Sequence, residues 1–123
     1  MEYSFEKLTV YQTARQLVKE VYLLLHKFPQ VERYGLCDQL RRAIISVPSN
    51  IAEQSGRTSP KEKIHFLEIA YGSLMESYCQ LDIAVDLGYI TSEELEPLKK
   101  LFTDTSRMIS GLKKKFAEQI SNH

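Results

Sequence analysis

The fold is decided by residues 59–88, which read SPKEKIHFLEIAYGSLMESYCQLDIAVDLG. Ser59 has the side chain of a helix N-cap, Pro60 suits the first helical position, and Glu62 completes a capping box. Gly88 can adopt the left-handed conformation that ends a helix. These signals predict one uninterrupted helix between the two ends.

This predicted helix carries apolar residues on more than one side. One seam repeats at three- and four-residue spacing, as in a helix face that packs into a core. It consists of Leu67, Ala70, Leu74, Leu81 and Val85. A second flank consists of Ile64, Phe66, Ile69, Tyr71, Met75, Tyr78 and Ile83. Gly72 weakens the helix, and the lack of a side chain there predicts the close approach of a neighbouring backbone.

Capping and stop signals predict a helix before this segment and another after it. Thr9 and Gln12 have the spacing of a capping box, and the helix that they start should stop before Pro29. Thr91 and Glu94 have the same spacing and start the last helix.

The remaining helix follows Gly35, and its apolar phase continues past Pro48. We therefore expect a kink near Ser46 rather than a break. The predicted helices span residues 10–27, 36–56, 60–87 and 92–119.

Short connections between long helices make sequential helices antiparallel. The sequence has no strand pattern, so we predict an all-α fold, an antiparallel up-down-up-down four-helix bundle. The 123 residues, 43% of them hydrophobic, suffice for one domain over residues 1–123 without disulfides or metal.

Charge and cysteine content limit the partners and the cellular compartment that we expect for this protein. Sixteen Lys and Arg balance sixteen Asp and Glu, so a nucleic-acid partner would need a local patch. We expect Cys37 and Cys79 to be buried free thiols. The N-terminus does not resemble a signal peptide and no apolar run could span a membrane, so we expect a cytoplasmic protein without membrane contact.

No motif indicates catalysis or a cofactor. One Glu-x-x-His motif, Glu62 to His65, has no second copy to complete a di-iron site. His26 and His123 lie too far along the chain to form a recognisable zinc pattern with the cysteines. Because no phosphate loop or nucleophile motif is present either, we expect no catalytic residue, no metal and no cofactor.

A polar stripe follows one face of the helix predicted over residues 36–56. It consists of Arg42, Ser46, Asn50, Glu53 and Arg57. Two interpretations remain open, a solvated face with an Arg57–Glu53 pair, or a buried or subunit-contacting network that fixes register and oligomeric state.

Basic residues form two further groups. Antiparallel packing would bring the turn near residue 57 to the same end as the last helix. That end would carry Arg57, Lys61, Lys63, Lys113, Lys114 and Lys115. Lys100, Arg107 and Lys114 are seven residues apart and share an outer face. These groups are candidates for binding nucleic acid, and the alternative is a solubilising surface.

Several motifs together resemble a known family over nearly the whole chain. They are FEKL at 5–8 with YQ at 11–12, RYGL at 33–36, QLRRA at 39–43, VPSNIAE at 47–53, FLEIA at 66–70, GSL at 72–74 and DLGY at 86–89. The chain resembles the bacterial four-helix-bundle proteins named after 23S ribosomal RNA intervening sequences. It departs from their pattern at Tyr11, where Trp is common, and at Gln54-Ser55, where a Gly usually comes sooner.

The resemblance implies a ring-like homo-oligomer, a pentamer in related proteins, but no settled activity. A related branch serves as a nucleic-acid-binding accessory to the reverse transcriptase of diversity-generating retroelements. The second apolar flank independently favours self-association, because a monomer would leave it wet; Tyr71, Met75 and Tyr78 are the interface candidates. Two functions stay open, a nucleic-acid-binding accessory for RNA or DNA and a scaffold that holds another protein.

Overall fold

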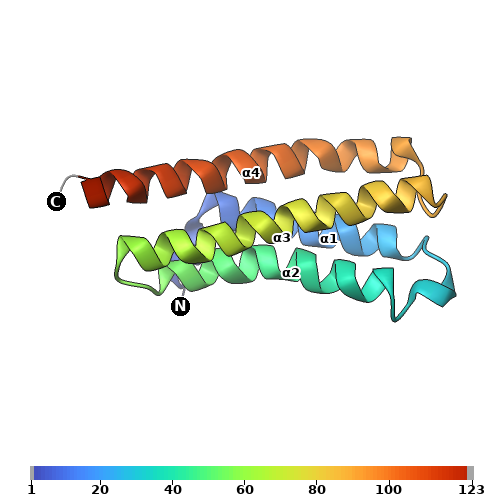
Figure 1. Cartoon of the computed structure of the whole chain (residues 1–123), viewed down its shortest axis with the longest axis horizontal. Coiled ribbons are helices and arrows are strands. Elements are labelled where there is room, and N and C mark those ends of the chain that lie inside the picture. The colour runs from blue at the N-terminus through green and yellow to red at the C-terminus, as the bar shows by residue number, and fades with distance from the viewer. Residues whose placement is uncertain (1, 122–123) are drawn as a thin grey trace.

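Four α-helices and two short 3-10 turns make up the structure (Figure 1). The computed structural model describes residues 2–121, and no strand occurs in that range. In chain order the elements are η1 (Ser4–Lys7), α1 (Thr9–Leu25), η2 (Gln30–Glu32), α2 (Leu36–Ser55), α3 (Pro60–Asp86) and α4 (Ser92–Ser121). The predicted all-α class with four helices is confirmed. α1 ends two residues earlier than predicted and α4 continues two residues further.

Capping residues fix the ends of α3 and α4. The backbone N–H of Glu62 donates to Ser59 Oγ at 3.1 Å. At α4 both halves of the capping box form, with the Thr91 N–H donating to Glu94 Oε1 at 2.9 Å and the Glu94 N–H donating to Thr91 Oγ1 at 3.1 Å. Gly88 follows α3 with a φ of 77°, so the predicted left-handed cap is also confirmed.

The start of α1 differs from its prediction. Thr9 is already the first helical residue, and no side chain caps the helix. The Gln12 amide instead donates to the carbonyl oxygen of Glu6 at 3.1 Å. The capping box predicted at Thr9 is wrong because Leu8 is the N-cap and the Gln12 side chain bonds to η1 instead.

Each helix packs against two others, in the cycle α1, α2, α3, α4 and back to α1. Between α2 and α3 the side-chain contacts run in opposite directions along the two helices. They join Gln39 to Gln80, Ser46 to Ser73 and Gln54 to Lys63. α2 continues through Pro48 without a break.

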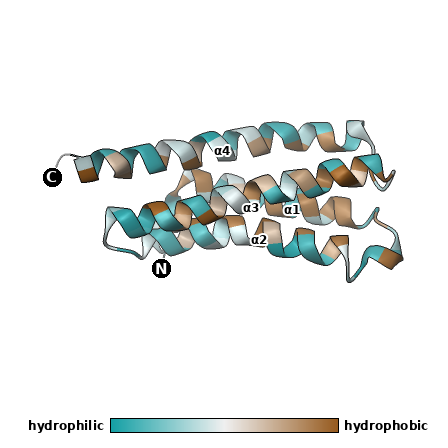
Figure 2. Cartoon of the chain, in the orientation of Figure 1, coloured by the Kyte–Doolittle hydropathy of each residue, from teal (hydrophilic) through white to brown (hydrophobic). Residues whose placement is uncertain are grey.

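The core lies between all four helices. Leu17, Ile44, Leu74 and Ile109 come from successive helices and are fully buried. Burying each such side chain stabilises the fold by about 1.5–3 kcal/mol. Figure 2 shows hydrophilic and hydrophobic residues interleaved along every helix, as expected where one face is buried and the other is wet.

Two residue-level predictions on α3 were wrong. Cys37 on α2 is buried as expected, but Cys79 is exposed. A Cβ at Gly72 would meet no atom within 4 Å, so no backbone of the described chain approaches it closely. Gly72 and Cys79 are seven residues apart and therefore share one helix face, which points away from the core.

Candidate nucleic-acid interface

Six of the eight predicted basic residues lie where the α2–α3 connection and the last turns of α4 come to the same end of the molecule, at the left of Figure 1. The Lys63 Nζ donates to the carbonyl oxygen of Gln54 at 3.0 Å and lies 5.4 Å from the ring centroid of Phe116. The Lys113 ammonium lies 3.9 Å from the Glu68 carboxylate. These contacts join the end of α2, the start of α3 and the end of α4. We call the region that carries Arg57, Lys61, Lys63, Lys113, Lys114 and Lys115 the basic end.

Carboxylates partly offset three of the predicted basic residues. Arg57 pairs with Glu53 and also lies 3.9 Å from Glu62. Lys113 pairs with Glu68, and Lys100 pairs with Asp104 at 2.9 Å. No carboxylate of residues 2–121 lies within 4 Å of the other five, which are Lys61, Lys63, Arg107, Lys114 and Lys115.

The outer row on α4 is separate from much of the basic end. Lys100, Arg107 and Lys114 are all exposed and follow one face of the helix. Only Lys114 belongs to both groups. The row therefore extends positive charge from the basic end along the outside of α4.

A pocket of about 200 Å³ opens at the basic end. Its polar and aromatic lining consists of Ser4, Gln54, Ser55, Lys63, Lys115 and Phe116. Phe116 holds both ammonium groups over its ring, with Lys63 at 5.4 Å and Lys115 at 6.0 Å from the centroid. The η1 turn supplies Ser4, so residues of η1, α2, α3 and α4 together build this pocket.

The polar stripe on α2 divides into separate local contacts. Arg42 pairs with Asp38 at 2.7 Å, and Arg57 pairs with Glu53. The amide of Asn50 donates to the carbonyl oxygen and to the Oγ of Ser46, at 2.8 and 2.9 Å. The structure thus contains the Arg57–Glu53 pair of the solvated interpretation.

Within residues 2–121, Ser46 and Arg57 are the members of the stripe that reach α3, Arg57 through Glu62 at 3.9 Å and the Phe66 ring at 4.7 Å. The Ser73 hydroxyl on α3 donates to Ser46 Oγ at 2.8 Å. Nearby, the buried Gln80 amide donates to Gln39 Oε1 and to Glu76 Oε1, each at 3.2 Å. Neither Ser73 nor Gln80 was predicted to be a functional residue, although Ser73 lies three residues after the core residue Ala70 and Gln80 lies directly before the core residue Leu81.

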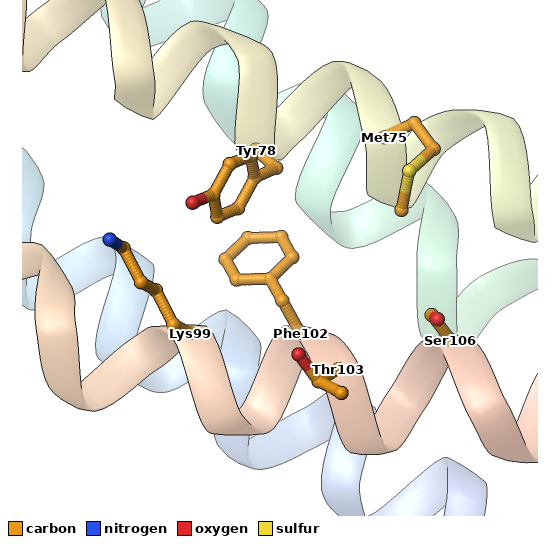
Figure 3. A pocket seen from close by; sticks show the side chains of 6 residues that line it. All are labelled: Met75, Tyr78, Lys99, Phe102, Thr103 and Ser106. Atoms are coloured by element: carbon orange, nitrogen blue, oxygen red, sulfur yellow. The ribbon is translucent and has the colours of Figure 1, made fainter.

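Two of the three interface candidates on α3, Met75 and Tyr78, line an apolar groove between α3 and α4 (Figure 3). Tyr78 packs edge-on against Phe102 with 5.2 Å between ring centroids, and Met75 lies beside them. Tyr71 and Tyr78 are half-buried against their own core, whereas Met75 is 40% exposed. Part of the second apolar flank of α3, which was expected to be exposed to solvent in a monomer, is therefore covered within one chain.

At the other end of the molecule Glu32 connects two loops. Its carboxylate accepts from the Tyr89 hydroxyl at 2.7 Å and from the backbone N–H of Leu36 at 3.1 Å. These bonds lower the pKa of the Glu32 carboxyl, that from Tyr89 most. Burial raises the pKa of the neighbouring Cys37 thiol. These groups hold the start of α2 against the α3–α4 turn and form no recognisable catalytic arrangement.

No group of three His, Cys, Asp or Glu side chains in residues 2–121 is placed to hold a metal ion. The His65 ring packs against Phe66 with 5.3 Å between centroids. His123 lies outside the described residues. Within them, every helix is too short or too polar to cross a bilayer.

Comparison with known proteins identifies a family over most of the chain. The family model described as 23S rRNA-intervening sequence protein matches residues 6–111, from η1 into α4. No curated protein matches the chain. The family resemblance that the sequence motifs indicated is confirmed.

Proposed function

Because the chain belongs to the 23S rRNA-intervening sequence protein family, we propose that it is a non-catalytic cytoplasmic protein that binds RNA or DNA through its basic end. It works without a metal or cofactor. The bundle is antiparallel and up-down-up-down, and the reversal of the chain at each connection in Figure 1 supports this topology. Copies of the chain assemble into a ring-like homo-oligomer, a pentamer.

One observation carries this proposal. Two lysines that have no carboxylate of residues 2–121 within 4 Å, Lys63 from α3 and Lys115 from α4, meet around Phe116 at one end of a chain whose formal net charge is zero. Such charges are available for phosphate oxygens, whereas paired ones are partly neutralised. A ring would repeat this group in every subunit, so that a small patch becomes a basic rim.

Contacts of this type position a nucleic acid without reading its sequence. We therefore expect sequence-tolerant binding whose affinity falls steeply as salt rises. Fluorescence anisotropy with labelled single-stranded RNA and DNA over a salt series measures both properties.

The test variant replaces Lys114 and Lys115 with Gln, and the matched control replaces Arg15 and Lys19 on α1 with Gln. We expect the test variant to weaken binding equally across sequences and to reduce the salt slope by about 1.4, since each phosphate contact to a single strand contributes about 0.7. The control should keep the slope of the parent chain. Equal losses in both variants would show that binding is not localised at the basic end.

A protein scaffold is the second candidate function. The exposed apolar groove beside Met75 and Tyr78 favours it, because apolar surface of this type is typical of protein contacts. An absence of oligonucleotide binding by the parent chain at low salt would favour the scaffold.

A further inference from the structure

The pocket at the basic end contains a buried polar side chain with no protein partner for its oxygen. Gln54 is 3% exposed, and within residues 2–121 its Oε1 has no hydrogen-bond partner. Buried polar atoms in folded proteins nearly always have partners, and an exception calls for a bound water, ion or ligand. Gln54 is one of the residues that line this pocket.

The charges around the pocket select the type of ligand. Lys63 and Lys115 line it, and no Asp or Glu does. Neither lysine has a carboxylate of the described residues within 4 Å. Phe116 closes one side, with the Lys63 and Lys115 ammonium groups over its ring.

We propose that this pocket binds one phosphate group of a nucleic-acid strand. Lys63 and Lys115 supply the positive charge, Ser4 offers a hydroxyl, and the Gln54 amide donates to a phosphate oxygen. This proposal depends on the proposed function only in naming a nucleic acid as the source of the phosphate.

The first experiment uses inorganic phosphate as the probe. In spectra of the ¹⁵N-labelled chain, a phosphate titration should produce saturable shifts at the backbone amides of Gln54, Ser55 and Lys115. Gln54→Met keeps the length of the side chain and removes its polar atoms. It should weaken phosphate binding by about tenfold, which is typical for losing a hydrogen bond to a charged group. Lys19→Gln, on exposed α1 surface, is the control and should bind phosphate as the parent does.

The second experiment separates the pocket from general electrostatic attraction. Gln54 has no charge, so Gln54→Met should weaken oligonucleotide binding by the same factor at every salt concentration and leave the salt slope unchanged. Lys115→Gln should reduce the slope by about 0.7. Thermal unfolding followed by circular dichroism checks the fold; Gln54→Met should melt no earlier than the parent, because it removes a buried atom without a partner.

Three outcomes distinguish the proposals. If Gln54→Met binds phosphate and oligonucleotides like the parent, the pocket proposal is overturned while the nucleic-acid function stands. Phosphate shifts that spread evenly over all basic residues without saturation overturn it as well. Saturable phosphate binding with no oligonucleotide binding at low salt overturns nucleic acid as the source and identifies a site for free phosphate.

Discussion

At the residue scale, the bond between Glu32 and Tyr89 shows best what a single side chain does for this fold. Glu32 accepts from the first N–H of α2 and from a tyrosine 57 residues away, so it joins a helix start to a distant turn. Tyr89 also packs on Phe28 with 5.5 Å between ring centroids. The sequence shows each residue but not their pairing, because periodicity relates residues within one helix and not across loops.

We predict that Tyr89→Phe destabilises the chain, because the aromatic packing stays and only the hydroxyl is lost. Urea denaturation of both chains at about pH 7 measures the difference in unfolding free energy. Tyr22→Phe is the control, since Tyr22 is exposed on α1 and has no side-chain bond in the described residues. An equal effect of the two substitutions would contradict a structural role for the Glu32 bond.

The same difference should depend on pH. The Tyr89 bond lowers the pKa of the Glu32 carboxyl below its ordinary 4.5. A lowered pKa stabilises the fold above the unfolded value, and this stabilisation is lost as the pH falls through the folded value. The bond also raises the pKa of Tyr89 above 10.0, so that contribution is present below this value and lost as the pH rises through the raised one. We expect a plateau between about pH 5 and about pH 9, with smaller differences on both sides.

At the element scale, the ends of the strongly capped helices were predictable, whereas the side of α3 that stays exposed was not. The caps of α3 and α4 follow from local bonds between residues three apart, which the sequence displays directly. The exposure of Cys79 depends on which side of α3 meets α2 and α4. A helix with apolar residues on several sides does not fix that rotation from its own sequence. For the candidate site, the gathering of the basic residues followed from helix order alone, whereas the pocket required the contribution of η1.

Gly72 allows a test of which side of α3 is exposed, because a Cβ added there would meet no atom within 4 Å in one chain. We predict that Gly72→Ala stabilises α3 by about 0.5–1 kcal/mol, the usual gain when Ala replaces Gly inside a helix. Gly111→Ala on α4 is the matched control, since its Cβ would also meet nothing within 4 Å. Chemical denaturation of both variants gives the comparison. A gain at Gly111 with a loss at Gly72 would show that another subunit packs closely on Gly72.

At the scale of the whole molecule, the α3–α4 groove leaves apolar surface uncovered within one chain. The groove exposes apolar atoms of Met75, Tyr78 and Phe102, and more apolar side chains follow on α3, where Ile69 is 38% and Ile83 43% exposed. Apolar residues spread along one helix are typical of a protein contact. A second copy of the chain is the occupant that the proposed ring provides.

We predict a homo-oligomer at micromolar concentration, with a mass of five times the 14.2 kDa chain if the ring is a pentamer. Light scattering coupled to size exclusion measures this mass.

Met75→Glu should shift this mass toward that of one chain, because a carboxylate buried without a partner in an apolar contact is strongly unfavourable. Val31→Glu is the control, since Val31 is 86% exposed on η2, away from the groove, and should leave the mass unchanged. A monomeric parent, or an unchanged mass for Met75→Glu, would show that this groove is not the subunit contact. If the parent chain is a monomer, no ring forms and the basic end has only the charges of one chain for binding phosphates. The salt slope of the parent would then be correspondingly small, because it reflects the number of phosphate contacts.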